Sequence, residues 1–337
     1  MTVASVEVFA PPLCPLSALF DGKVTNCTSH FPTYRTSSRQ EKRLGDDVSL
    51  KRCINGEDFM IVVTGAAGRL GKQVVRRLVD EGFEILGTDK VPFDDSPTPY
   101  IQADLCDAEK ANEVLKGADA LIHMGATPGP QRHGSSEIFE NNVPSTFNIM
   151  MAAADKKLRR VVFSSSAFGM GWAHEPAAFI PKYLPLDEEH PMMPFEAYGL
   201  SKQVGECIAG MISRNSSTSV ASLRFTNVAY PEVQAEFPWA APTQENPRTL
   251  VMWAYADSRD VVEMHLLALR GEFEGHEAFL IAQPKTRFQE PTLDLIRQNF
   301  GSQVEIRGEL RDNASVISTR KAQHMLGFKP RQNWNES

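Results

Sequence analysis

Tyr198 and Lys202 stand four positions apart in the segment EAYGLSKQVGE, and together they could move a proton. Residues with this spacing share one face of a helix. A phenol has a pKa of about 10 and is a weak base at neutral pH, but an adjacent ammonium group stabilises the phenolate and lowers that pKa. We therefore expect Tyr198 to take a proton from a substrate hydroxyl as hydride leaves the same carbon, or to return one during reduction.

Three consecutive serines, Ser164, Ser165 and Ser166, follow an apolar stretch that is typical of a buried strand. A hydroxyl group at such a strand end could hold the substrate oxygen beside the tyrosine. A tyrosine and a lysine at this spacing, taken alone, more often form a surface pair. The catalytic interpretation therefore depends on what the rest of the chain places around them.

The segment MIVVTGAAGRLGKQVVRRLVDEG, residues 60–82, indicates a site for a dinucleotide. Its apolar start predicts a buried strand at 60–63, and apolar residues then recur at helical spacing. Between these two elements stand three glycines, Gly65, Gly68 and Gly71. Because glycines have no Cβ, a phosphate could approach the backbone N–H groups at the start of the helix closely.

A second predicted strand, residues 84–89, ends in Asp89. An acid about twenty residues past the glycines binds the ribose hydroxyls in dinucleotide-binding folds. The alternative is a glycine turn that only packs a helix tightly on a strand. Strand, helix and terminal acid occur in the right order here, and this favours the dinucleotide site.

Apolar and amphipathic stretches continue to alternate along the chain. They predict strands at 60–63, 84–89, 100–103, 118–124, 159–164 and 219–225, and helices over 107–116, 136–155 and 195–214. This alternation favours parallel βα units, so we predict an α/β fold with a Rossmann-type doubly wound parallel sheet and a small C-terminal substrate-binding lobe. Two long irregular stretches, 167–195 and 226–256, follow strand ends, where such sheets bind ligands, and we place the substrate pocket there.

The composition bears on partners and location. The 337 residues carry a formal net charge of -7, which argues against nucleic acid as a partner because such binding calls for a basic face. The sequence has no apolar run of about eighteen residues, so we expect no membrane segment. The five cysteines are scattered without the spacing of a disulfide framework or a metal site. We therefore predict a cytoplasmic protein without a metal.

From about Phe59 to Trp334 the chain resembles the extended short-chain dehydrogenase/reductase superfamily, the group of NAD-dependent epimerases and dehydratases. The motifs that carry the resemblance are TGAAGRLG (64–71), DL (104–105), IHMGA (122–126), NNVPSTFN (141–148), SSSAFGMG (164–171), YGLSK (198–202) and LRFTN (223–227). Two further segments, LVMWAYADSRDVVEMHLLAL and LGFKPRQNW, resemble the compact branch that contains uronate dehydrogenase.

The resemblance implies NAD as the cofactor. Asp89 would favour NAD over NADP, because its carboxylate would repel the additional phosphate group. The residues that the resemblance assigns to cofactor binding are Gly65, Gly68, Arg69, Leu70, Gly71, Asp89, Asp104, Leu105, Gly125, Ala126, Ser164, Tyr198, Lys202, Phe225 and Asn227.

The resemblance also implies which residues catalyse the reaction and hold the substrate. The catalytic set is Tyr198 and Lys202, Ser166 as the leading serine with Ser165 as the second, and Asn142 as support for the active-site helix. The substrate set is Thr127, Ser166, Asn227 and Arg248. In that branch an arginine at the position of Arg248 grips a sugar carboxylate, although here it could equally pair with Glu245 or Asp257.

The implied domain plan has an NAD-binding Rossmann domain at 59–225, to which 257–282 return, and a substrate-binding lobe made of 226–256 and 283–337. Residues 1–58 show no sustained periodicity, and we expect a disordered extension there, with a cryptic targeting signal as the alternative. The helices at 136–155 and 196–214 would form a homodimer surface, with exposed contacts at Met150, Met151, Ile208 and Met211.

We expect an NAD-dependent oxidoreductase that transfers hydride between NAD and a small hydroxylated or carbonyl substrate, with sugar acids among the candidates, by a Ser–Tyr–Lys mechanism. A nucleotide-sugar epimerase or dehydratase is the alternative. It is disfavoured because the chain after Tyr198 is short for a larger lobe, and because Ala167 and Phe168 stand where a dehydratase needs an acid pair. A non-catalytic NAD-binding regulator is the third reading, although such relatives commonly lose the tyrosine or the lysine.

Overall fold

The structure is a computed structural model that describes residues 59–129, 133–172, 180–245, 250, 253–331 and 334. Two of the sequence-based predictions, the extension at 1–58 and the substrate contact at Arg248, lie outside these residues.

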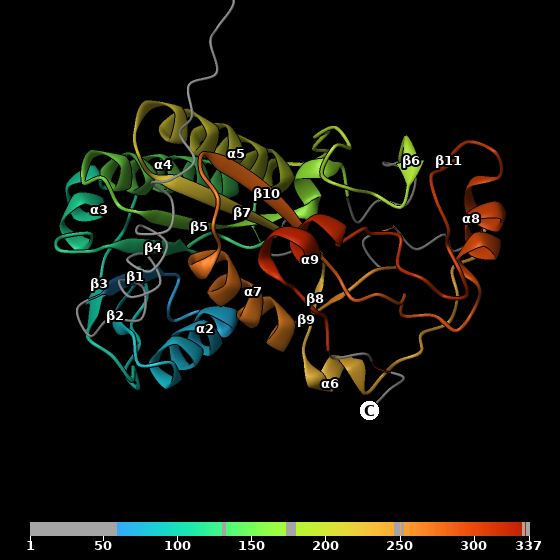
Figure 1. Ribbon diagram of the computed structural model, residues 1–337, viewed down its shortest axis with the longest axis horizontal. Coiled ribbons are helices and arrows are strands. Elements are labelled where there is room, and N and C mark those ends of the chain that lie inside the picture. Colours follow the sequence, from blue (N-terminus) through green and yellow to red (C-terminus); the bar gives the residue numbers. More distant parts are fainter. Residues whose placement is uncertain are drawn as a thin grey trace, which may run out of the picture. The chain divides into compact units, whose positions relative to one another are not determined.

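A seven-stranded sheet in which all neighbouring strands run parallel forms the centre of the fold (Figure 1). Its strands are β1 (Met60–Thr64), β2 (Glu84–Asp89), β3 (Tyr100–Gln102), β4 (Ala120–His123), β5 (Arg160–Ser166), β7 (Ser219–Phe225) and β10 (His276–Ile281). They lie in the order β10-β7-β5-β4-β1-β2-β3. The chain therefore adds β2 and β3 on one side of β1 and the later strands on the other side, so the order of the strands reverses between β1 and β4. The predicted doubly wound α/β fold is confirmed, and a site for a ligand is expected at that reversal.

Six of these strands were predicted from the sequence, and β10 was not. It pairs with β7 from His276 opposite Val220 to Ile281 opposite Phe225, and so extends the sheet by one strand at its edge. Its sequence, HEAFLI, begins with two polar residues, so the apolar run that marks a buried strand is only four residues long.

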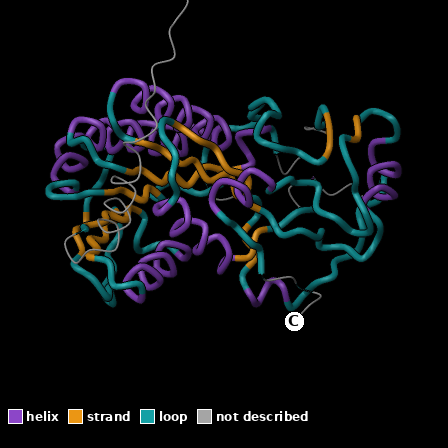
Figure 2. The backbone as a smooth tube through the Cα atoms, viewed as in Figure 1, coloured by secondary structure: helices purple, strands orange, loops and turns teal. Residues whose placement is uncertain are grey.

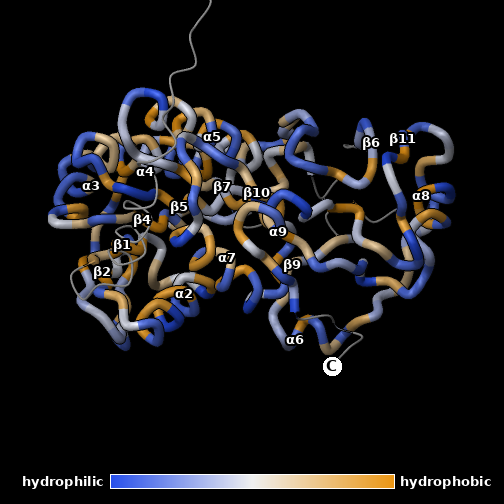
Figure 3. The backbone as a smooth tube through the Cα atoms, in the orientation of Figure 1, coloured by the Kyte–Doolittle hydropathy of each residue, from blue (hydrophilic) through white to orange (hydrophobic). Residues whose placement is uncertain are grey.

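Helices cover both faces of the sheet. One face carries α2 (Arg69–Asp80) and α7 (Ser258–Arg270), and the other carries α3 (Ala108–Val114), α4 (Ser135–Asp155) and α5 (Ala197–Asn215) (Figure 1). Helix α2 is an example of a helix with one apolar face: hydrophilic and hydrophobic residues are interspersed along it (Figure 3), and the residues buried on its sheet-facing side are Gly71, Val74, Val75 and Leu78. Asp107 caps α3, its side chain accepting from the N–H groups of Glu109 and Lys110.

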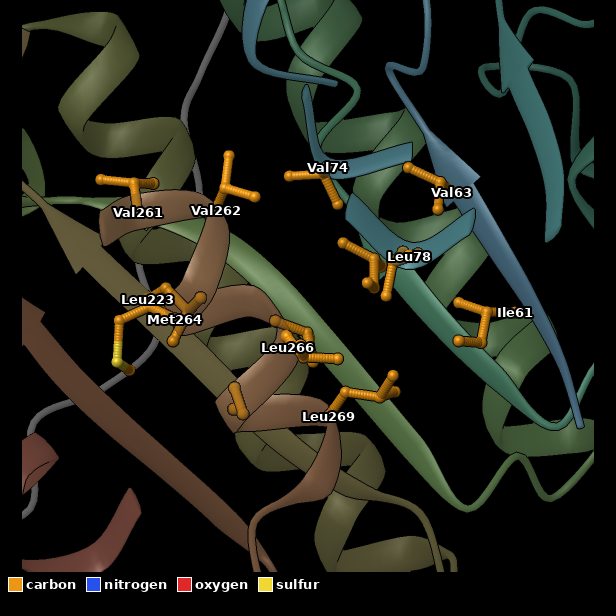
Figure 4. Packing of buried hydrophobic residues seen from close by; sticks show 14 of the residues in the cluster. Ile61, Val63, Val74, Leu78, Leu223, Val261, Val262, Met264, Leu266 and Leu269 are labelled. Atoms are coloured by element: carbon orange, nitrogen blue, oxygen red, sulfur yellow. The ribbon is translucent and has the colours of Figure 1, made fainter. Parts of the chain in front are cut away.

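Two apolar cores result, one on each face of the sheet. In the core beneath α2 and α7, side chains of both helices meet those of β1 and β7 (Figure 4). Examples are Leu78, Leu266 and Ile61, all at most 1% exposed. The second core joins α3, α4 and α5 to the opposite side chains of the same strands. Because burial on both faces anchors the strands, the loops at their carboxyl ends have a rigid base.

The chain beyond the carboxyl ends of the strands is mainly loop with short elements (Figure 2). These elements are the 3-10 helix η1 (Ala167–Met170), β6 (Tyr183–Leu184), β8 (Val228–Ala229), α6 (Pro231–Gln234), β9 (Ala256–Asp257), α8 (Thr292–Phe300) and β11 (Glu305–Ile306). The last helix, α9 (Arg320–Leu326), instead packs on β10, and its buried Ala322 and Leu326 belong to the core beneath α2 and α7. A third apolar cluster, which includes Trp172, Trp253 and Phe288, holds much of this region together. Among the described helices, none combines the length and apolar character needed to cross a bilayer.

Two of the residues proposed as exposed dimer contacts are in fact buried. Met150 is fully buried and Ile208 is 8% exposed, and both belong to the core beneath α4 and α5. The helices were predicted well, but their rotation about their own axes depends on what they pack against. The large apolar residues that these helices do expose are Phe139, Phe147 and Leu200.

Candidate active site

The glycine turn after β1 lies directly against the end of β4. Gly65 has a φ of +69°, which favours glycine, and a Cβ there would lie 2.8 Å from the Gly125 nitrogen. A Cβ on Gly71 would lie 2.0 Å from the Gly65 oxygen, so α2 starts in contact with the turn. Gly68 precedes α2 as its N-cap, and Arg69 and Leu70 are its first residues. This cradle fits the diphosphate of a dinucleotide, because backbone N–H groups and the helix dipole meet where no side chain intervenes.

A cavity of about 360 Å³ lies beside this turn and brings predicted cofactor residues together. Its lining includes Gly65, Asp89, Lys90, Ala103, Asp104, Leu105, Gly125, Ala126, Thr127 and Asn141. The Asp89 carboxylate accepts hydrogen bonds from the backbone N–H groups of Ala67, at 3.2 Å, and Lys90, at 2.8 Å. These bonds fix two acceptor oxygens at the cavity, the arrangement that suits a ribose diol.

Lys90 is a cavity residue that the sequence analysis missed. Its ammonium group donates to Asn141 Oδ1 at 3.0 Å and lies 4.0 Å from Asp104 Oδ2, so it connects the end of β2 to α4. The available signal was its position directly after Asp89. A backbone hydrogen bond from Cys106, together with the nearby lysine charge, lowers the pKa of Asp104.

A buried histidine, also missed, ties β1 to β4 and α4. Thr64 Oγ1 accepts hydrogen bonds from the N–H groups of Met124 and Gly125, at 3.1 and 3.0 Å. Its own proton must therefore go to His123 Nδ1, 2.7 Å away, which leaves His123 Nε2–H to donate to Thr146 at 3.0 Å. Burial, with the Lys202 charge as a second cause, lowers the pKa of His123 to about 3. A neutral histidine thus ties β4 to Thr64 of β1 and to Thr146 of α4.

Asn142 connects the cavity wall to helix α5. Its Oδ1 accepts the Thr127 N–H at 2.7 Å, and its Nδ2 donates to the Thr127 carbonyl at 3.1 Å and to Ser201 Oγ at 3.2 Å. Ser201 in turn donates to the Tyr198 carbonyl at 2.7 Å. Asn142 and Thr127 are therefore in contact with each other, and Asn142 reaches the first turn of α5.

The three serines have different partners because side chains alternate along a strand. Ser166 Oγ accepts the Phe168 N–H at 3.2 Å and lies close enough to the Tyr198 phenol to lower its pKa. Ser165 Oγ instead donates to buried Glu206 at 2.5 Å, where Arg224 also binds that carboxylate. The structure therefore brings Ser166 to Tyr198 and turns Ser165 away from it. This corrects the choice of Ser165 as second catalytic serine.

The Ser164 hydroxyl contacts His265 on α7, and the Ser164 backbone carbonyl contacts Lys202. His265 Nδ1 donates to the Val261 carbonyl at 2.7 Å, so His265 Nε2 accepts the Ser164 hydroxyl proton at 2.9 Å. The Lys202 ammonium donates to the Ser164 carbonyl at 2.8 Å. Ser164 thus contacts Lys202 through its backbone carbonyl, while its side chain is engaged by His265 on α7.

Tyr198 and Lys202 lie together on α5, with the ammonium 5.5 Å from the centre of the tyrosine ring. Burial lowers the pKa of Lys202 to about 8. Burial also raises the pKa of Tyr198 to about 12; the Glu196 charge raises it further, and Ser166 opposes both. The expected lowering of the Tyr198 pKa is therefore wrong for this structure, because loss of water on burial outweighs the lowering effect of Ser166.

Phe225 and Asn227 lie where β7 ends. The Phe225 ring is 6.2 Å from the ring of His265, and the Asn227 carbonyl accepts the Ala256 N–H at 3.1 Å. Neither is among the cavity-lining residues, so their placement near the nicotinamide stays a prediction. Within the described part of the chain, no group of three or more His, Cys, Asp or Glu side chains is placed to hold a metal ion.

This fold and this site belong to a known class of enzyme. Residues 61–282 match the model of the NAD dependent epimerase/dehydratase family, and the chain belongs to that family. Its cofactor is accordingly NAD, for which the glycine cradle and the fixed Asp89 carboxylate are suited.

Several proteins within this class resemble the chain. The uronate dehydrogenase of Pseudomonas putida is 28% identical over 210 residues, 61% of this chain and 70% of that protein. The UDP-glucose 4-epimerase of Lactobacillus helveticus is 29% identical over 178 residues, 50% of this chain and 52% of that protein. The chain spans about half the length of several curated epimerases that it matches.

A solved structure shows the same fold. A short-chain dehydrogenase/reductase superfamily protein from Agrobacterium tumefaciens, with bound NAD, has a TM-score of 0.64 and 23% identity, covering 82% of this chain and 94% of that one.

Proposed function

We propose that this protein is an NAD-dependent dehydrogenase or reductase that acts on a small hydroxylated or carbonyl compound. One observation carries the proposal: Ser166 lies close enough to the Tyr198 phenol to lower its pKa, and Lys202 lies on the same helix as Tyr198. A hydroxyl donor, a proton carrier and a cation thus meet at the carboxyl end of β5. NAD, when bound, takes hydride from an alcohol carbon or gives hydride to a carbonyl carbon.

Three residues around the reacting oxygen would bind it, exchange its proton and stabilise the resulting charge. Ser166 would donate a hydrogen bond to the substrate oxygen, and Tyr198 would take the hydroxyl proton in oxidation or supply one in reduction. Lys202 is held by the Ser164 carbonyl at 2.8 Å, and its charge would stabilise the phenolate once that proton has left. Burial keeps water from competing with these contacts.

Sugar acids are the substrate class that we propose first. Support comes from the similarity to a uronate dehydrogenase, and from Arg248, whose guanidinium could bind a carboxylate in bidentate fashion. Arg248 lies outside the described residues, so its role rests on the sequence alone.

Sugar epimerisation is the second candidate, and the similarity to UDP-glucose 4-epimerases favours it. An epimerase removes hydride and returns it to the same substrate, so it produces no free NADH. Dehydration is less well supported, because the residues after Ser166 are Ala167, which is buried, and Phe168, which packs edge-on against Tyr198. Neither supplies the acid that an elimination needs.

One experiment separates these functions. The protein is incubated with NAD and a panel of uronates, other sugar acids and polyols, with UDP-sugars in parallel, while NADH absorbance and product identity are followed. Stoichiometric NADH with an oxidised product supports the proposal. A rearranged sugar without NADH supports the epimerase, and unchanged substrates throughout would contradict both. Tyr198→Phe serves as the control for activity that belongs to this site.

We also propose the domain plan and a homodimer as parts of this function. Support for the lobe comes from the apolar cluster around Trp253 and Phe288, which is separate from the two cores of the sheet and also takes in Trp172 and Leu186 from the 59–225 segment. Support for the dimer comes from the apolar residues that α4 and α5 leave at the surface. A twofold homodimer is the commonest way to cover such a face.

A further inference from the structure

A chain of four side-chain hydrogen bonds joins the cofactor cavity to the helix that carries Tyr198. The Lys90 ammonium donates to Asn141 Oδ1 at 3.0 Å, and Asn141 Nδ2 donates to Asn142 Oδ1 at 3.1 Å. Asn142 Nδ2 donates to Ser201 Oγ at 3.2 Å, and Ser201 donates to the Tyr198 carbonyl at 2.7 Å. The chain of bonds therefore starts in the wall of the cavity and ends at the first turn of α5.

Every bond of this chain runs in the same direction. A lysine can only donate, so Asn141 must turn its carbonyl oxygen to Lys90 and its NH₂ group to Asn142. The Thr127 N–H, at 2.7 Å, fixes the Asn142 carbonyl oxygen as an acceptor in the same way and leaves the NH₂ group of that amide for Ser201. Hydrogen bonds aligned like this polarise and strengthen one another. The four bonds should therefore respond as a unit.

Burial increases along the chain of bonds. The Lys90 side chain is 54% exposed, Asn141 is half-buried, and Asn142 and Ser201 are each 2% exposed. Water competes with the exposed bond between Lys90 and Asn141, whereas a ligand that covers the cavity wall removes this competition. Because Lys90 directly follows Asp89, the residue assigned to the ribose, an adenosine group would lie beside this bond. Its binding should tighten the bond.

We propose that Asn141 is a positioning residue that transmits occupation of the adenosine end of the cavity to the first turn of α5, with Lys90 as the contact on the cavity side. Asn141 holds Lys90 with one end of its amide and Asn142 with the other, so an adenosine group that fixes the lysine also fixes Asn142. Asn142 in turn restricts Ser201 and the helical turn that presents Tyr198. This inference requires NAD binding but does not depend on which substrate the protein uses.

The test uses ADP, which carries the adenosine and diphosphate groups but lacks the nicotinamide half that would reach Tyr198 and Lys202 directly. Backbone hydrogen exchange of the peptide 196–204 is measured by mass spectrometry on the full-length protein, with and without saturating ADP. We expect ADP to slow exchange in this peptide by about fivefold, the change that one net hydrogen bond produces. Calorimetry establishes the saturating concentration for each protein.

Two variants break the chain of bonds at different points. Asn141→Leu removes both hydrogen bonds of the amide at nearly constant volume, and Lys90→Met removes the ammonium but keeps the apolar stem. The contact between Thr127 and Asn142 uses neither of the replaced side chains, so it stays in place. In both variants ADP should no longer slow exchange in the peptide 196–204.

Asn148→Leu is the matched control. Asn148 lies on the same helix, α4, but its Nδ2 donates to the carbonyls of Leu105 and Cys106, at 3.1 and 2.9 Å, rather than to Asn142. This variant also removes two hydrogen bonds made by an asparagine of α4. It should nevertheless keep the full effect of ADP, because the chain of bonds to α5 is intact.

Three results would overturn the inference. They are exchange in 196–204 that saturating ADP leaves unchanged in the parent protein, an effect of ADP that persists in Asn141→Leu or in Lys90→Met, and an effect that is lost equally in Asn148→Leu. Asn141→Ala replaces the leucine variant if that protein does not fold. The measurement uses no substrate, so its outcome is independent of the proposed function, which turnover of Tyr198→Phe tests instead.

Discussion

Gly205 of α5 is in direct contact with the ring of Phe163 on β5, since a Cβ on Gly205 would lie 2.5 Å from Phe163 Cζ. The same ring stacks on His123 at 5.8 Å between centres, and the Lys202 ammonium lies 5.1 Å from its centre. The ring is therefore not free to move aside. This contact sets how closely α5 approaches the sheet, and so where Tyr198 and Lys202 lie.

Gly205→Ala should therefore reduce both stability and turnover. Overpacking of this kind costs about 1–3 kcal/mol, and the displaced helix should lower kcat. Denaturant unfolding and kcat are measured together, with Gly134→Ala as the control, because a Cβ there meets nothing within 4 Å. If Gly205→Ala behaves like this control, the contact does not set the helix position.

Replacing the proton carrier should abolish turnover but spare cofactor binding. We expect Tyr198→Phe to lower kcat by about 10²–10⁴-fold while NAD affinity, measured by calorimetry, changes little. Lys202→Met should lower kcat as well, because the phenolate loses its neighbouring cation. Hydride transfer near the parent rate in Tyr198→Phe would refute the mechanism.

The serine geometry predicts opposite phenotypes for neighbouring substitutions. Ser166→Ala should cost about 10²–10³-fold in kcat with little loss of stability, because it removes the donor at the substrate oxygen. Ser165→Ala should leave kcat nearly unchanged but destabilise the fold by about 1–3 kcal/mol, because the buried Glu206 carboxylate loses a donor. Steady-state kinetics and urea unfolding separate these effects. A larger kcat loss in Ser165→Ala would show that the serine assignment is wrong.

Two buried histidines should make the fold sensitive to acid. Burial lowers the pKa of His265 to about 4 and that of His123 to about 3, whereas an unfolded histidine titrates at about 6.5. The unfolded chain then binds more protons below that pH, so their contribution is complete above pH 6.5 and is lost as the pH falls. Each should cost about 2 kcal/mol at pH 5.

The measurement is urea unfolding at pH 7 and pH 5 for the parent protein and for His265→Gln. The variant should be less stable at pH 7, yet should lose about 2 kcal/mol less on acidification. Equal losses in the two proteins would mean that His265 does not stay neutral in the folded state. His324, a surface histidine of α9, provides the control substitution His324→Gln.

The proposed homodimer should depend on the exposed apolar residues of α4. Phe147 is 44% exposed, and Phe147→Glu should shift the protein to monomer by placing a charge in the interface. Ile306→Glu, at a residue of β11 that is 37% exposed, should leave the assembly unchanged. Light scattering at micromolar concentration measures the oligomeric state of both variants. A parent protein that is already monomeric under these conditions would reject the dimer.

Much of the site could be predicted because local sequence encodes it. The glycines after β1, the acid that ends β2, and the tyrosine and lysine one helical turn apart are patterns within short segments. The positions of Asp89 and Gly125 on one cavity follow from the rule that parallel strands end at the same edge. Lys90 and His123 were missed because their roles depend on partners, Asn141 and Thr146, that are distant in sequence.

By itself, the sequence determined the class of fold, the cofactor and the chemistry that Tyr198 and Lys202 can perform, because spacing alone puts such residues on one helix face or at one strand end. Only the tertiary structure decided which serine faces Tyr198. Side chains of Ser165 and Ser166 point to opposite faces of β5, and the packing of α5 on the strand determines which of them meets Tyr198. The tertiary structure also decided the rotation of α4 and α5, and therefore that Met150 is core and Phe147 is surface. Finally, the raised pKa of Tyr198 results mainly from burial, because loss of solvent depends on every element packed around the ring and is not encoded in local spacing.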